Sequence, residues 1–189
     1  MVRIAAAASV WAVVTGVGIA GGTEAQAAGQ ALGASQASRC FTFARQGSVT
    51  RAAVDACGIA LTEEPLTPRS RAGTLVNRGV LHMNRGDHEA AGADFEAALQ
   101  LQPRLGEAYF NRGSLRVAVG RLAEGVADID ESLRLGFDQP EKAYYNRAVA
   151  REKLSDPRGA YEDYREAARL KPDWELPRAE LARFSLRAP

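Results

Sequence analysis

The triplet Asn77-Arg78-Gly79 returns as Asn111-Arg112-Gly113 and, with one substitution, as Asn146-Arg147-Ala148. The starting positions 77, 111 and 146 give a period of about 34 residues, with one extra position between the second and third copies. A period in this range is typical of helical arrays, in which each two-helix unit buries its apolar face against its neighbours. We therefore interpret the chain as a series of repeats before considering its other features.

Around each triplet the sequence predicts two helices joined by a short turn. In the first copy, residues 72–85 form one helix, Gly86-Asp87 breaks it, and a second helix follows from about His88 to Gln102. The next two units turn at Gly120-Arg121 and at Ser155-Asp156. A proline ends the first and third units, whereas Phe137 stands at that place in the second and Pro140 follows, which accounts for its extra residue.

The recurring order is a large residue, a small residue, a turn, an alanine or glycine, a large residue and a proline. With its period of about 34 residues, this order resembles the tetratricopeptide repeat family, and the resemblance covers Ala72 to about Trp174. It implies an all-α fold of antiparallel helix hairpins, stacked as a short right-handed superhelix with a concave face. The small residues would permit close helix crossing, and they are Gly79, Gly113 and Ala148, facing Ala91, Gly125 and Ala160.

The same template extends upstream in a weaker form. The spacing of Ala91, Phe95, Ala98, Leu99 and Pro103 is reproduced by Ala53, Cys57, Ala60, Leu61 and Pro65. Phe41 stands where a small residue is expected, so this first repeat is degenerate. The expected organisation is a signal peptide at 1–27, a flexible lead-in at 28–34, a degenerate first hairpin at 35–71, repeats at 72–105, 106–140 and 141–174, and a capping helix with a tail at 175–189.

The N-terminal segment 1–27 has the three parts of a secretory signal peptide. Arg3 supplies a positive start, positions 4–20 form an uncharged run, and Ala25-Gln26-Ala27 is a small-x-small cleavage signal. We expect export to the periplasm or the exterior, with a mature chain beginning at Ala28 and no membrane span after cleavage. The alternative is an uncleaved anchor, which the short run disfavours because a span needs about 20 apolar residues.

The two cysteines, Cys40 and Cys57, both lie in the expected mature chain. An oxidising compartment favours a disulfide between them. In the repeat register, Cys40 occupies the place of the triplet's arginine. We therefore predict that the disulfide links the two helices of the first hairpin.

Each repeat pairs its triplet arginine with an aspartate on the second helix at constant spacing. Because an unpaired buried guanidinium is costly, we predict bidentate ion pairs within or between neighbouring hairpins. The residues are Arg78 with Asp94, Arg112 with Asp128 and Arg147 with Asp163. The functional alternative is that these arginines line a groove and bind an acidic ligand.

The composition offers little support for nucleic-acid binding or catalysis. Lysine and arginine number 24 against 23 aspartate and glutamate residues, so there is no basic excess. We find no nucleophile motif, phosphate loop or metal-ligand cluster, and we predict no cofactor and no enzymatic activity. His82 and His88 lie in one repeat, and an enzyme or metal site that uses them is the weakest alternative.

The resemblance implies that the first helix of each hairpin lines a concave groove for a protein or peptide partner. The lining positions are Val76, Val80, Met83, Glu107, Phe110, Ser114, Val117, Lys142, Tyr145, Val149 and Glu152. The predicted function is an exported scaffold that holds another protein through this groove. The alternative function is a self-associating structural module of an envelope complex. For the lining residues, the alternative is that they merely pack between repeats.

Overall fold

The computed structural model describes residues 35–185, and all regular structure in that range is helical. The expected signal peptide and lead-in lie outside the described residues. The helices are α2 (Gln36–Arg45), α3 (Arg51–Glu63), α4 (Pro68–Arg85), α5 (His88–Leu101), α6 (Gly106–Ala118), α7 (Leu122–Arg134), α8 (Pro140–Lys153), α9 (Pro157–Leu170) and α10 (Glu175–Ser185). The predicted all-α class of stacked hairpins is confirmed.

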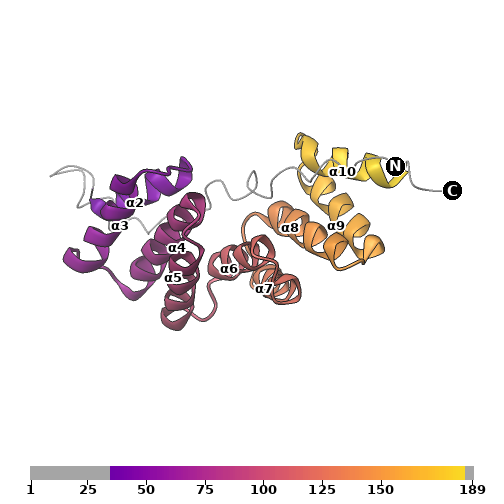
Figure 1. Ribbon diagram of the computed structural model, residues 1–189. Helices are drawn as coiled ribbons and strands as arrows, with labels where there is room; N and C mark the ends of the chain where they lie inside the picture. Colours follow the sequence, from indigo (N-terminus) through magenta and orange to yellow (C-terminus); the bar gives the residue numbers. More distant parts are fainter. Residues whose placement is uncertain (1–34, 186–189) are drawn as a thin grey trace.

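Within residues 35–185, four hairpins form a row that ends in a single helix (Figure 1). The paired helices are α2 with α3, α4 with α5, α6 with α7 and α8 with α9, and α10 packs on α9. The second helix of each hairpin contacts the first helix of the next. The first helices also touch one another, because α4 contacts α2 and α6, and α6 contacts α8. We term the surface formed by α2, α4, α6 and α8 the first-helix face.

Three of the turns within hairpins use the same left-handed backbone conformation. Gly86 and Gly120 each have a φ of 85°, which glycine adopts without the steric cost of a Cβ atom. Ser155 takes the equivalent place in the third repeat with a φ of 63°. The turn geometry is therefore kept even where the glycine is absent.

Helix α4 begins at Pro68, earlier than the predicted start at Ala72. The side chain of Thr67 accepts a hydrogen bond from the backbone N–H of Ser70, and Pro68 occupies the first turn, where its missing N–H costs nothing. Arg71 also donates from Nη1 to the carbonyl oxygen of Leu61, 2.8 Å away. These local signals, which lie outside the repeat template, extend the helix.

The first hairpin contains the predicted disulfide. Cys40 of α2 and Cys57 of α3 are bonded, with their Cα atoms 4.8 Å apart, and both are fully buried. The carboxylate of Glu64 accepts hydrogen bonds from the backbone N–H groups of Gln36 and Ala37, which ties the start of α2 to the end of α3. The hairpin at the end of the row is thus closed by a covalent bond and by a side-chain cap.

None of the helices between residues 35 and 185 is both long enough and apolar enough to cross a membrane.

Candidate functional site: the first-helix face and its junctions

The three complete repeats each hold a buried carboxylate between their two helices. Arg78 donates from Nε and Nη2 to the two carboxylate oxygens of Asp94, at 2.8 and 2.7 Å. Arg112 bonds Asp128 at 2.9 and 2.8 Å, and Arg147 bonds Asp163 at 2.9 and 2.7 Å, with the same two donor atoms. The structure therefore contains the predicted bidentate pairs, and each one lies within its own hairpin.

A second arginine, which the sequence analysis missed, completes two of these clusters. Arg116 donates from Nη1 to Oδ2 of Asp128 at 2.6 Å, and Arg151 makes the matching bond to Asp163 at 2.9 Å. The equivalent residue of the first repeat is His82, whose Nδ1 lies 3.5 Å from Oδ2 of Asp87. Comparing positions 82, 116 and 151 across the repeats would have shown that an arginine recurs at this place and that a histidine replaces it in the first repeat.

The triplet arginines have further internal partners. The guanidinium of Arg112 lies over the ring of Tyr109, 5.4 Å from its centroid, and that of Arg147 lies over Tyr144 at 5.2 Å. Hydrogen bonding by Asp128 raises the pKa of Arg112, although burial opposes the shift. Because their donors are engaged inside the protein, these arginines are poorly placed to bind an acidic ligand.

In the third copy of the triplet, the asparagine joins neighbouring hairpins. Asn146 of α8 donates from Nδ2 to Oγ of Ser114 on α6, 2.7 Å away, and Ser114 in turn donates to the carbonyl oxygen of Phe110. Asn111 donates to the carbonyl oxygen of Glu107 within its own helix. The third triplet therefore contributes a contact along the row of first helices, and all three triplets contribute a contact across their own hairpin.

Most of the predicted groove lining is buried, and this corrects the expectation of an open apolar surface. Seven side chains are at most 8% exposed, namely Val76, Val80, Met83, Phe110, Ser114, Val117 and Tyr145. The physical reason is packing: Val76, Val80 and Met83 share a core with Phe95, while Phe110 stacks on Phe137 with ring centroids 4.5 Å apart. Partner binding by these seven residues stays a prediction that their burial does not support.

The other four predicted lining residues are partly exposed. Glu152 accepts a hydrogen bond from the hydroxyl of Tyr164 at 3.3 Å and forms an ion pair with Arg183 of α10, so it anchors the terminal helix. Burial lowers the pKa of Lys142. Val149 contacts the cores around Phe110 and Tyr145, and Glu107 lines the pocket described below. Glu107, Lys142 and Val149 are therefore the predicted lining residues that a partner can reach.

Tyr145 supports a prediction about alkaline stability. Burial raises its pKa from 10.0 to about 12. The unfolded chain therefore loses the phenolic proton first, so the contribution of Tyr145 to stability should fall by roughly 2 kcal/mol as the pH rises from about 10 to about 12. Burial raises the pKa of Tyr164 as well, so Tyr145→Phe should reduce the alkaline decline without abolishing it.

Urea unfolding experiments at increasing pH measure this decline. Tyr161→Phe, at an exposed ring, serves as the control and should leave the decline as it is in the wild type. A decline in Tyr145→Phe that matches the wild type would contradict the assignment.

The two histidines have ordinary structural surroundings. His82 is partly buried beside Asp87, and His88 begins α5. Between residues 35 and 185, no three histidine, cysteine, aspartate or glutamate side chains are grouped so as to hold a metal ion.

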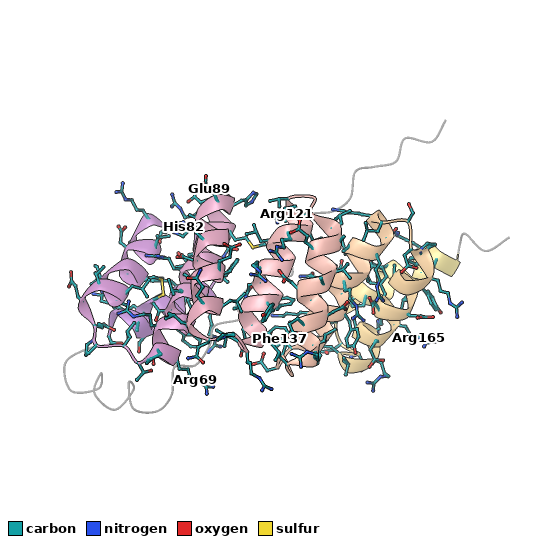
Figure 2. The ribbon with its side chains drawn as sticks, turned by 90° about the horizontal axis from the view of Figure 1, so that it is seen from below. Arg69, His82, Glu89, Arg121, Phe137 and Arg165 are labelled. Atoms are coloured by element: carbon teal, nitrogen blue, oxygen red, sulfur yellow. A yellow bond between two sulfur atoms is a disulfide. The ribbon has the colours of Figure 1, made fainter. Side chains whose placement is uncertain are left out.

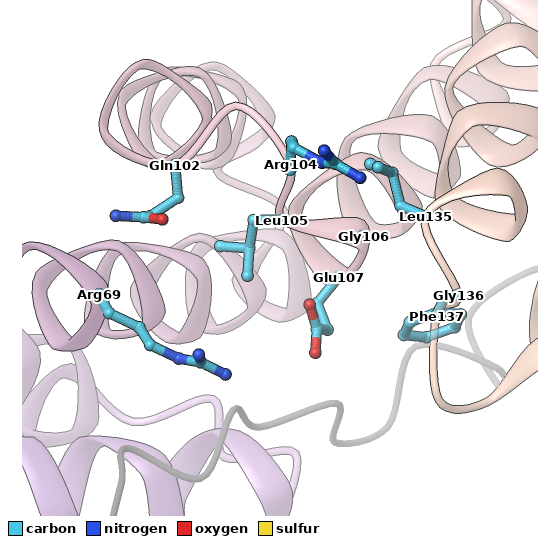
Figure 3. Close-up of a pocket in the computed structure, with 9 residues that line it drawn as sticks. All are labelled: Arg69, Gln102, Arg104, Leu105, Gly106, Glu107, Leu135, Gly136 and Phe137. Atoms are coloured by element: carbon cyan, nitrogen blue, oxygen red, sulfur yellow. The ribbon is translucent and has the colours of Figure 1, made fainter.

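A pocket lies where the α5–α6 and α7–α8 connections meet the start of α4 (Figure 3). We term it the junction pocket. Its volume is about 220 Å³, and its lining residues are Arg69, Gln102, Arg104, Leu105, Gly106, Glu107, Leu135, Gly136 and Phe137. Of these, only Glu107 was predicted to bind a partner.

Comparison with known proteins agrees with this architecture. A sequence profile of the tetratricopeptide repeat matches residues 72–105 and 141–173. Each of these two segments contains one copy of the repeated triplet. The middle hairpin lies outside the matched segments, and it is the one in which Phe137 replaces the terminal proline. Its tetratricopeptide-like character rests on the shared geometry of its helices and its arginine–aspartate pair.

Two curated relatives are similar in sequence to part of this chain. The human mitochondrial import receptor subunit TOM70 is 34% identical over 73 residues, which are 39% of this chain and 12% of that protein. The photosystem I assembly protein Ycf3 of Acaryochloris marina (strain MBIC 11017) is 36% identical over 91 residues, 48% of this chain and 52% of that protein. The chain thus spans about half of Ycf3 and about an eighth of TOM70.

Two solved structures resemble this chain over most of its length. The crystal structure of MamA superposes with a TM-score of 0.61 at 18% identity, covering 75% of this chain and 80% of that one. A double mutant of MamA RS-1 gives a TM-score of 0.64 at 18% identity, covering 89% and 86%. At this identity the likeness establishes the fold alone.

Proposed function

We propose that this protein is an exported adaptor that binds another protein through the first-helix face and its junctions, without catalysis of its own. The observation that carries the proposal is the continuous row of first helices, from α2 to α8, built from repeats that also occur in an import receptor subunit and an assembly protein. On this face Glu107 of α6 and Lys142 of α8 occupy the same repeat position, and both are partly exposed. A surface of this kind suits an extended or helical segment of a partner.

Export is supported by two features of the chain. The N-terminal residues have the composition of a secretory signal, and the buried disulfide in the first hairpin suits an oxidising compartment. The protein purified from its native host should therefore begin at Ala28 and carry linked Cys40 and Cys57. A chain that begins at Met1 with two free thiols would contradict export with cleavage.

The binding proposal is tested by site-specific photo-crosslinking in the native host. A crosslinking residue at Glu107 or Lys142, both on first helices, is expected to capture the same protein. A matched probe at Glu162, on the exposed side of α9, should capture none. Equal capture from all three positions would refute binding by the first-helix face. Capture of a second copy of this chain would instead support the self-associating alternative.

A further inference from the structure

The junction pocket is bounded on one side by the α7–α8 connection, which is a residue longer than the other connections between hairpins. Helix α7 ends at Arg134, and Gly136 takes a left-handed φ of 77°, after which the N–H of Phe137 donates to the carbonyl oxygen of Ser132 at 3.1 Å. The α5–α6 connection has no such turn, because its C-cap Gln102 has a φ of −136°. The two connections therefore diverge and leave space between them.

The walls of this space are of two kinds. Leu105, Leu135 and Phe137 supply an apolar part, whereas Arg69, Arg104, Gln102 and Glu107 supply polar groups. Figure 3 shows Arg69 and Glu107 extending into the same open space below Leu105, with Arg104 beside Leu135 on the opposite rim. The charged side chains come from two places along the chain, the start of α4 and residues 104–107, which no single helix could bring together.

The two arginines of the pocket differ from the triplet arginines in having unused donors. Within the described part of the chain, the side chains of Arg69 and Arg104 form no ion pair and no hydrogen bond, and both residues are exposed. The pKa of Glu131 is lowered mainly by its hydrogen bond to Arg134 and only to a lesser extent by the charge of Arg104. The guanidinium group presents five N–H donors in a planar fork that matches a carboxylate, so these donors are available to a ligand.

The charge balance and size of the pocket select the kind of ligand. Two guanidinium groups against the single carboxylate of Glu107 leave a net charge of +1 in the lining, which suits one negative charge better than a phosphate dianion. The volume of about 220 Å³ is below the range of about 300–1,000 Å³ that is usual for drug-sized ligands. A single acidic side chain, with an apolar neighbour that packs against Leu105 and Leu135, fits both the net charge and the volume of the pocket.

We propose that the junction pocket binds an acidic side chain of an extended partner segment, with the carboxylate bound by Arg69 and with Arg104 adding positive charge from the opposite rim. Glu107 accepts a backbone N–H of the same segment, and Leu105 and Leu135 contact the flanking apolar residue. The inference rests on the protein-binding function proposed above, and it specifies the chemistry that the partner must carry.

The test uses the full chain and a fluorescent, end-blocked peptide of alternating leucine and aspartate. We expect binding that weakens about tenfold when asparagine replaces aspartate in the peptide, and by a similar factor in Arg69→Gln/Arg104→Gln, because charged hydrogen bonds are lost. Arg165→Gln is the matched control, since it removes an exposed arginine from α9, at a distance from the pocket (Figure 2). This control should bind like the wild type.

Backbone amide NMR signals locate the contact. The peptide should shift the signals of Gly106 and Gly136 in the pocket and leave those of Gly92 and Gly159 unchanged. The proposal is overturned if the wild type does not bind the peptide, if Arg165→Gln weakens binding as much as the pocket variant does, or if inorganic phosphate displaces the peptide. Crosslinked capture at Glu107 that persists in the pocket variant would refute this inference alone and leave the adaptor function standing.

Discussion

Replacing Asp128 by asparagine is expected to lower the free energy of unfolding by about 3 kcal/mol, because it removes the charged partner of two mostly buried arginines. The side chain of Asp128 is 7% exposed, and those of Arg112 and Arg116 are 19% and 17% exposed. Both guanidinium groups would keep their charge, and neither can reach water fully without disturbing the helix pair. Urea unfolding followed by circular dichroism measures the loss.

The repeats provide internal controls for this prediction. Asp94→Asn should cost less, because Arg78 is its single arginine partner among the described residues and is 29% exposed. Asp130→Asn removes an acid that is 48% exposed and that pairs with Arg147 across hairpins, so its effect should stay below about 0.5 kcal/mol. A loss below about 1 kcal/mol for Asp128→Asn, or one no larger than that of Asp130→Asn, would show that the cluster contributes little to stability.

A double substitution separates the loss of the ion pair from the cost of leaving a buried guanidinium group without its carboxylate partner. In Asp128→Asn/Arg116→Met the second guanidinium is removed, which in Asp128→Asn alone would keep only its 3.9 Å contact with Glu124. The double variant should therefore be more stable than the sum of the two single effects implies. Additive effects would indicate that the two residues act independently, which their 2.6 Å hydrogen bond argues against.

Much of this arrangement could be predicted from the sequence, because the repeat period superimposes equivalent residues. Arg78 and Asp94 recur together in three units, and Cys40 falls in the arginine's register, so the pairs and the disulfide follow from spacing and from the cost of burying an unpaired charge. Arg116 and Arg151 recur as well, but His82 interrupts their series, and the pattern was missed.

Other features depend on three-dimensional packing that the period does not contain. Phe110 was expected to line a groove, and it is buried because Phe137, which follows the next helix of the chain, turns back onto its ring. Arg69 and Arg104 line one pocket together with Leu135 and Phe137 of the α7–α8 connection, which is a residue longer than the other connections between hairpins. An irregularity in a repeat thus marked the place where the structure departs from the family template.

The second large effect is expected at the crossing of α6 and α7, where Gly113 faces Gly125. A Cβ atom at Gly125 would lie 2.6 Å from Cγ2 of Val117, 3.1 Å from its backbone nitrogen and 3.0 Å from the carbonyl oxygen of Gly113. The backbone atoms can yield only if the helices move apart. We expect Gly125→Ala to lower the free energy of unfolding by about 2 kcal/mol, despite a helix-propensity gain of about 1 kcal/mol.

Gly92→Ala is the matched control, because the nearest atom to its added Cβ would be Cδ2 of Leu115, at an ordinary 3.6 Å. This variant should gain about 0.5–1 kcal/mol from helix propensity, so the two substitutions should have opposite signs in urea unfolding. Ala148 and Ala160 hold the equivalent positions in the third hairpin, which shows that the fold accepts alanine where the helices are spaced for it. A stabilising Gly125→Ala would mean that α6 and α7 adjust their spacing freely, and that the small residue on the second helix does not set how closely the hairpin closes.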